Sequence, residues 1–310
     1  MSGSEITLPR FPGLYGKLPA RGDFVSRRLD SDFINGWDAW LQRLMSESRE
    51  ALGARWLECF LSAPVWRFAI PAGMFSKSGW VGLLLPSVDR VGRYFPLTIA
   101  APVHEDRINV PSTLSKAWGW LDSIDRLAIE ALTPQLDLEL FDRRLAELPV
   151  PDDVPVVLPA SDDTVPLGVS QPTFQVWQFA PDVPDIALQQ ALGDGSLGLR
   201  SSSALWMTRG GETLAPCIAV CGDLIPGGHF CAMLDGRWSE HSWTLGIKRS
   251  SPPADATPAS VLSCDSETQR VDLIHGQGKH GGAVPPLAAS TRSENETAMG
   301  SRSEKGIVSP

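Results

Sequence analysis

Two apolar runs and the polar loop between them make up Trp80-Val-Gly-Leu-Leu-Leu-Pro-Ser-Val-Asp-Arg-Val-Gly-Arg-Tyr-Phe-Pro-Leu-Thr-Ile-Ala-Ala-Pro-Val103. A third run of this kind, Val65–Ile70, comes shortly before them. Short apolar runs bounded by proline and glycine are typical of strands, so we expect strands over 65–70, 80–85 and 94–103. Pro96 predicts that the last strand lies at an edge of the sheet or carries a bulge, because proline cannot donate a hydrogen bond to the ladder.

Apolar residues at helical spacing flank these strands on both sides in the sequence. We expect one helix to begin at Ser31 or Asp32, either of which can cap it, and a short helix to follow around 56–61. Two more helices are expected after the strands, over 112–132 and 135–148. Strands bracketed by pairs of helices predict an α/β (α+β) fold, in which a sandwich of helices surrounds a mainly antiparallel sheet.

Composition divides the 310-residue chain into four segments. Prolines alternate with aspartates around 149–170, which predicts a stiff acidic linker. All aromatic residues lie between Phe11 and Trp243, so a tail over 249–310 has nothing to form a core with and is predicted to be disordered. We therefore expect an N-terminal domain at 1–148, a smaller second α/β domain at 171–248 and this disordered C-terminal tail. Within the smaller domain, strands are expected at 174–179, 203–208 and 216–221, and a helix at 184–192.

Charge and hydropathy exclude several classes of partner. The chain has 27 basic and 36 acidic side chains and a net charge of −9, which disfavours binding to nucleic acid and to anionic membranes. No apolar run approaches the roughly 18 residues of a membrane helix, and the first residues lack the pattern of an export signal. Five dispersed cysteines fit a reducing compartment. These features predict a cytoplasmic protein with protein partners and no membrane insertion.

The first candidate site is the loop that follows Gly13-Leu-Tyr-Gly16. A Gly-Lys pair suggests a phosphate-binding loop, but Phe11 and Leu18 stand where that motif needs glycine and Ser or Thr. We expect instead a strand that ends in a turn, in which Gly22 takes a backbone conformation that other residues avoid. The charged residues of this turn, which we expect to be solvated or ion-paired, are Lys17, Arg21 and Asp23.

The second candidate site is the polar loop 86–96, which contains Asp89, Arg90 and Arg93. Loops held by a rigid sheet often carry binding residues, and arginine beside Tyr94 is typical of protein interfaces. Alternatively, an arginine of this loop pairs with Asp23 or Asp89 and only stabilises the fold. The residues by themselves leave both interpretations open.

Metal binding and catalysis have weaker support in the sequence. The residues Cys217, Cys221, His229 and Cys231 do not have the spacing of a zinc finger or ribbon, and the first two are expected on one face of a strand. No Gly-x-Ser-x-Gly motif is present. We expect no metal, no cofactor and no catalytic residue.

Four separated motifs together resemble the TagF (also called ImpM) family of type VI secretion-associated proteins. They are Gly-Lys-Leu-Pro-Ala-Arg-Gly-Asp-Phe (16–24), Trp37-Asp-Ala-Trp40-Leu, Ala63-Pro-Val-Trp-Arg-Phe68 and Pro86-Ser-Val-Asp-Arg-Val-Gly-Arg-Tyr-Phe-Pro-Leu97. The resemblance implies a cytoplasmic, non-enzymatic accessory protein that represses assembly of the type VI secretion system after translation. It implies binding to the forkhead-associated scaffold protein of that system and a functional link to its threonine kinase and phosphatase pathway.

The resemblance also indicates candidate residues for binding the partner. Carried over from the motifs, they are Lys17, Arg21, Asp23, Asp89, Arg90 and Arg93. Two alternatives remain: a sensor or enzyme that holds an anion or nucleotide with these charges, and a structural component of the secretion apparatus. The final residues, 301–310, faintly resemble the first strand of a PP2C-type phosphatase, but without the acidic residues that would bind metal.

Overall fold

A nine-stranded sheet forms the centre of the computed structural model, which describes residues 11–103, 110–150, 174–193, 197 and 203–246. Within these ranges every pair of neighbouring strands is antiparallel except the last. In spatial order the strands are β2 (Val25–Arg27), β1 (Gly13–Gly16), β5 (Leu97–Val103), β4 (Gly79–Leu85), β3 (Trp66–Ile70), β7 (Ala204–Thr208), β8 (Cys217–Cys221), β6 (Phe174–Gln178) and β9 (Thr244–Leu245). The predicted mainly antiparallel sheet is confirmed.

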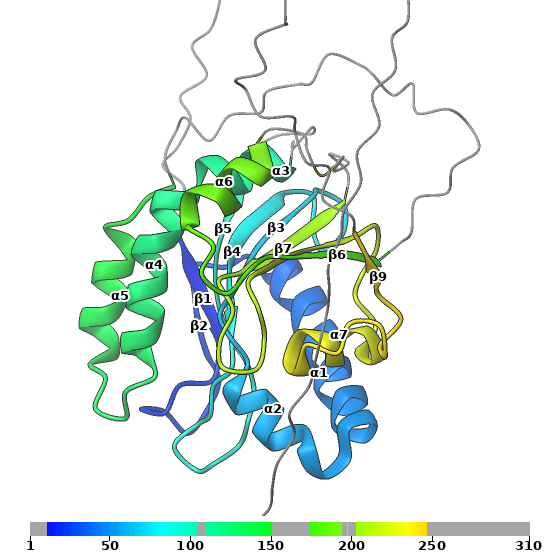
Figure 1. The fold of residues 1–310 in the computed structure, drawn as a ribbon. Helices are drawn as coiled ribbons and strands as arrows, with labels where there is room; N and C mark the ends of the chain where they lie inside the picture. The colour runs from blue at the N-terminus through cyan, green and yellow to red at the C-terminus, as the bar shows by residue number, and fades with distance from the viewer. Residues whose placement is uncertain (1–10, 104–109, 151–173, 194–196, 198–202, 247–310) are drawn as a thin grey trace, which may run out of the picture. The chain divides into compact units, whose positions relative to one another are not determined.

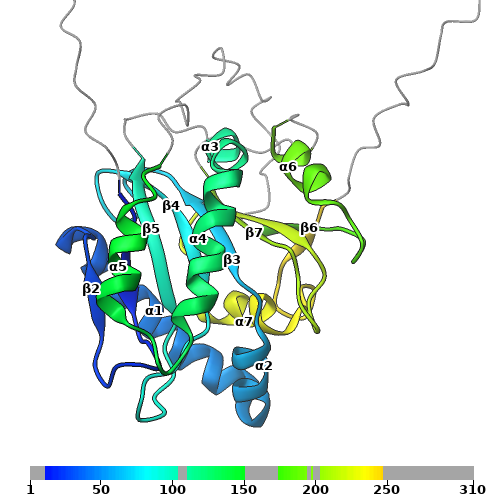
Figure 2. The ribbon, with the colours of Figure 1, turned by 90° about the vertical axis from the view of Figure 1, so that its left-hand side faces the viewer.

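Helices cover both faces of this sheet (Figure 1). One face carries α1 (Ser31–Leu52), η1 (Gly53–Arg55), α2 (Trp56–Ser62) and α7 (Gly227–Asp235). The other carries α3 (Val110–Lys116), α4 (Trp118–Ala131), α5 (Leu138–Ala146) and α6 (Asp185–Gly193), and Figure 2 looks onto this layer. Each layer encloses its own cluster of buried apolar side chains. The predicted sandwich of helices around a sheet is therefore confirmed.

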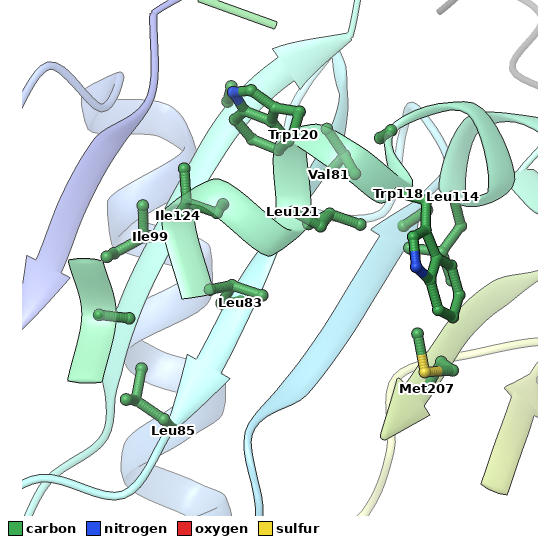
Figure 3. Close-up of a cluster of buried hydrophobic side chains, with 14 of the residues drawn as sticks. Val81, Leu83, Leu85, Ile99, Leu114, Trp118, Trp120, Leu121, Ile124 and Met207 are labelled. Atoms are coloured by element: carbon green, nitrogen blue, oxygen red, sulfur yellow. The ribbon is translucent and has the colours of Figure 1, made fainter. Parts of the chain in front are cut away.

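Burial on both faces explains why β4 is apolar throughout. Its Val81, Leu83 and Leu85 point toward the α4 side, where Leu121 and Ile124 pack (Figure 3). The alternate residues of the strand face α1 and join the second cluster. A strand covered on both faces is apolar at consecutive positions, whereas a strand with one solvent-exposed face alternates between apolar and polar residues.

Two expectations about this region were wrong. The third predicted strand lies inside the sheet, because β5 pairs with β1 on one side and with β4 on the other, and Pro96 precedes it. Pro102 lies within β5, but β1 pairs only as far as Ala100, so this proline breaks no bond to β1. The single helix expected over 112–132 is two helices, α3 and α4, which meet at Ala117.

The sheet continues across both predicted domains. Strand β3 pairs with β7 through Phe68 opposite Trp206, so the first and second blocks of sequence share one ladder. All described residues fall within one compact unit, Met1–Asp255. The predicted boundaries at 148 and 171 stay a prediction. Most of the predicted linker, all of the predicted disordered tail and the phosphatase-like segment 301–310 lie outside the described residues.

Candidate functional site

A buried ion pair joins the two candidate loops. Lys17 follows directly after β1, and its Nζ lies 2.9 Å from Oδ2 of Asp89 in the β4–β5 loop. The two side chains are 7% and 0% exposed. Ser87 reinforces the junction, because its hydroxyl donates to the carbonyl of Lys17 at 2.7 Å. Both charges are thus used inside the protein and are closed to solvent.

The carboxylate of Asp89 also organises its own loop. Its Oδ1 accepts hydrogen bonds from the backbone N–H groups of Val91 and Arg93 at 3.0 and 2.9 Å, and its Oδ2 accepts from Nε of Arg93 at 2.6 Å. Burial by itself would raise the pKa of Asp89, but the bonds from Arg93 and Lys17 outweigh it and hold this pKa well below its ordinary value. The loop is therefore built around a permanently charged carboxylate.

The remaining charges of the two loops lie at the surface. The backbone N–H of Arg90 donates to the carbonyl of Arg21 at 2.9 Å, so these two exposed arginines sit side by side. Among the described residues, neither guanidinium makes an ion pair. Arg93 is different, because it binds Asp89, donates to the carbonyl of Gly22 and approaches exposed Asp23 at 3.9 Å. The loops carry four cationic side chains against two carboxylates, on a chain whose net charge is −9.

The six predicted residues thus divide into two groups. Lys17 and Asp89 are buried and paired with each other, and Arg93 also pairs with Asp89, which is the arginine pairing that the second interpretation of the loop expected. Arg21, Asp23 and Arg90 are exposed, and of these only Asp23 approaches a charged partner, Arg93, among the described residues. A role of any of the six in binding stays a prediction.

The special glycine of the first loop is Gly16, and the prediction for Gly22 was wrong. Gly16 has φ 137°, and a Cβ there would lie 2.2 Å from the carbonyl oxygen of Pro96. The close approach of β1 to the start of β5 requires a residue without a side chain. The turn itself closes earlier, with the N–H of Arg21 bonded to the carbonyl of Leu18 at 2.9 Å, so Gly22 needs no positive φ.

An apolar groove lies beside these loops, where β3 begins and β4 ends. Its volume is about 250 Å³, and its apolar lining includes Pro19, Leu61, Val65, Pro86, Ile129 and Leu132. Leu61 and Ile129 are 52% and 55% exposed. A second hollow of about 250 Å³ shares Ile129 and is otherwise lined by Asp122, Asp125, Arg126 and Arg209. No single sequence motif predicts the groove, because its residues come from several separate parts of the chain.

The cysteines have structural positions. Cys217 and Cys221 lie on the same face of β8, as expected, and pack in the cluster under α7 with Cys231. Burial raises the pKa of Cys221 to about 12. His229 packs against the ring of Phe174, with 4.1 Å between centroids. Within the described ranges, no group of three His, Cys, Asp or Glu residues is arranged to hold a metal ion.

Comparison with known proteins identifies the part of the chain that carries both loops. Residues 13–148 match the TagF N-terminal domain, described as type VI secretion system-associated. This part of the chain belongs to the TagF family. The TagF assignment confirms the predicted resemblance and makes this a protein associated with type VI secretion.

The TagF domain is not the whole of the similarity. The crystal structure of PA0076 from Pseudomonas aeruginosa PAO1 is 29% identical, with a TM-score of 0.57, and the match covers 78% of this chain and 100% of that one. Residues 13–148 are less than half of the chain, so this similarity extends beyond the TagF domain. No curated protein matches the chain.

A charge cluster ties the TagF domain to the second block. Nη2 of Arg67, buried on β3, lies 2.5 Å from Asp122 and 3.0 Å from Asp125 on α4. Arg209, just after β7, pairs with both carboxylates and with Asp185 of α6. Burial alone would raise the pKa of Asp122, but the two guanidinium groups lower it below its ordinary value. Sequence reasoning missed this cluster because its members are far apart in the chain.

None of the helices in the described ranges combines the length and the hydropathy that a membrane crossing requires.

Proposed function

We propose that this TagF-family protein is a non-enzymatic, cytoplasmic binding module that represses assembly of the type VI secretion system. It binds the forkhead-associated scaffold protein of that system, in a pathway linked to the threonine kinase and phosphatase. The family assignment of residues 13–148 supports the link to type VI secretion. Repression by occupancy needs no turnover, so its strength follows the ratio of this protein to the scaffold.

The contact surface that we propose includes the exposed charges of the two loops, Arg21, Asp23 and Arg90. The support is the buried Lys17–Asp89 pair, which fixes the loops beneath them. Charges held on a fixed base can meet a complementary surface with little loss of conformational freedom. Arg90 is the best residue to test, because it is exposed and makes no ion pair among the described residues.

The same pair weighs against the alternative of an anion sensor. An anion site built on Lys17 would need its ammonium free, but that group is buried and bound to a carboxylate. The alternative of a structural component of the apparatus differs in its genetic outcome. Deleting a repressor raises secretion, whereas deleting a structural component abolishes it.

The test is capture of the scaffold by the full-length protein. The tagged protein is incubated with soluble lysate at modest salt, and bound proteins are identified by mass spectrometry. We expect the scaffold to dominate for the wild type and for R43E, a matched charge reversal at an exposed position on α1. R90E should retain about a tenth of it or less. A folded wild-type protein that captures no type VI component would refute the proposal.

A further inference from the structure

The apolar groove lies where three of the four family motifs meet. Pro19 comes from the first motif, Ala63 and Val65 come from the third, and Pro86 comes from the fourth. The C-terminal end of α4 completes the lining with Ile129 and Leu132. Residues brought together from separate stretches form one continuous apolar surface beside the exposed loop charges.

The exposed side chains at the groove are those of an interface. Leu61 and Ile129 are each more than half exposed, and Ile129 belongs to a helix, α4, whose other apolar residues are buried. An exposed apolar patch that adjoins polar groups is typical of a protein-binding site. At about 250 Å³ the groove is smaller than most small-molecule pockets, which measure about 300–1,000 Å³, so side chains of a protein segment suit it better.

The charge around the groove selects the occupant. On one side, Arg21 and Arg90 lie on the loops that contribute Pro19 and Pro86. On the other side, exposed Arg126 is one turn before Ile129 and makes no ion pair among the described residues.

The nearby carboxylates of α4 are already neutralised within the chain. Asp122 and Asp125 pair with arginines, and Glu130 pairs with Arg144. On the loop side and the α4 side the groove is therefore bordered by unpaired positive charge, while exposed Glu58 lies one turn before Leu61 on α2.

We infer that the groove binds a segment of the partner that inserts apolar side chains between Leu61 and Ile129 and places acidic residues against Arg21, Arg90 and Arg126. This inference rests on the proposed function, since it assigns the segment to the forkhead-associated scaffold. The apolar side chains supply the affinity, and the acidic residues set orientation and rate of association.

The test compares groove variants with variants at equally exposed apolar positions elsewhere. I129E and L61E place a carboxylate in the groove, and the controls I186E on α6 and L140E on α5 start from side chains that are 57% and 47% exposed. All four are purified as the full chain, and circular dichroism checks their folding. Affinity for the purified scaffold is measured by biolayer interferometry. We expect binding to weaken by about tenfold or more in both groove variants and by less than about twofold in the controls.

A peptide-binding experiment tests whether the groove prefers acidic residues. A synthetic peptide with leucines at helical spacing and glutamates between them should bind the wild type and compete with the scaffold. The same peptide with lysines in place of the glutamates should not. Binding of the acidic peptide should weaken in R126E and at high salt, because the rim charges are exposed and easily screened.

The outcomes separate the inference from the proposed function. If the scaffold binds and I129E and L61E bind it like the wild type, the groove inference fails and the proposed function stands. If the scaffold does not bind, the proposed function fails, and the peptide decides about the groove. A peptide that binds the wild type but not I129E then supports the groove for another partner, and a peptide that binds neither overturns it. A wild-type dimer that I129E dissociates would show a second copy in the groove and also overturn the inference.

Discussion

Replacing Arg67 with methionine should reduce the free energy of unfolding by about 2–3 kcal/mol. The guanidinium makes two bonds to carboxylates, to Asp122 at 2.5 Å and to Asp125 at 3.0 Å. Hydrogen bonds to charged groups contribute about 1.5–3 kcal/mol each, and the low end applies because both carboxylates are partly exposed and keep Arg209 as a partner. The two bonds therefore account for about 3–4 kcal/mol.

A second term opposes this loss. Nη1 of Arg67 is buried and has no hydrogen-bond partner among the described residues, and such an unpaired donor costs about 1–3 kcal/mol. Methionine removes it. Methionine also keeps an apolar chain against Trp118, whose ring lies 5.1 Å from the guanidinium carbon. Taken at its low end of about 1 kcal/mol, the relief lowers the net loss to about 2–3 kcal/mol.

The measurement is urea unfolding followed by tryptophan fluorescence and circular dichroism, with the slope compared between variants. R126M is the matched control, because Arg126 is exposed on the same helix as the two aspartates, and it should change stability by less than about 0.5 kcal/mol. A loss for R67M no greater than that of R126M would show that the cluster contributes nothing net, and the reasoning would be refuted.

Three further predictions concern other parts of the fold. The pKa of Asp122 is lowered in the folded protein, so the stability that its charge contributes is present at neutral pH and is lost as pH falls through the folded pKa. We therefore expect D122N to lose less stability than the wild type when unfolding is measured at decreasing pH below about 4. G82A should lower the free energy of unfolding by about 1–3 kcal/mol in thermal or urea unfolding, since its Cβ would lie 2.3 Å from the carbonyl oxygen of Ile99. In G119A on α4 the new Cβ meets open space, so this variant should raise the free energy of unfolding by about 0.5–1 kcal/mol. Cys217 and Cys221, both fully buried, should resist maleimide in the folded protein and react after unfolding, while partly exposed Cys59 should react before them. Mass spectrometry of the labelled peptides measures the order, and labelling of Cys221 before Cys59 would contradict the burial of β8.

Local pattern was sufficient for most of the elements. The spacing of Phe33, Trp37 and Leu41 indicated α1, and the structure buries all three. Helix α7 was missed because it begins with two glycines and its residues from Phe230 to Leu234 are all buried, so neither propensity nor periodicity marks it. Its support is tertiary, through packing against α1.

For the candidate site, the sequence predicted which residues belong to the two loops but not how they are arranged in space. The sequence placed Lys17 and Asp89 in two interesting loops, but they are 72 residues apart, and nothing local shows that they form a buried pair. The same holds for the groove, where Pro19, Leu61 and Ile129 meet from three elements. Contacts between distant residues depend on how the strands are ordered in the sheet, and that order was not deduced.

The pairing of β3 with β7 limits how this protein can be divided. A fragment cut at residue 148 would retain the whole TagF match but lose β7, and β3 would become an open edge along residues 67–69, where β7 now pairs with it. Trp206 would also be missing from its place against Trp37 and Phe68, leaving a large aromatic surface in water. Bare, flat, apolar edges promote aggregation. In this chain, therefore, the family match ends before the sheet is complete, and residues 13–148 are not expected to fold alone. Expression trials of TagF fragments should retain residues through 246.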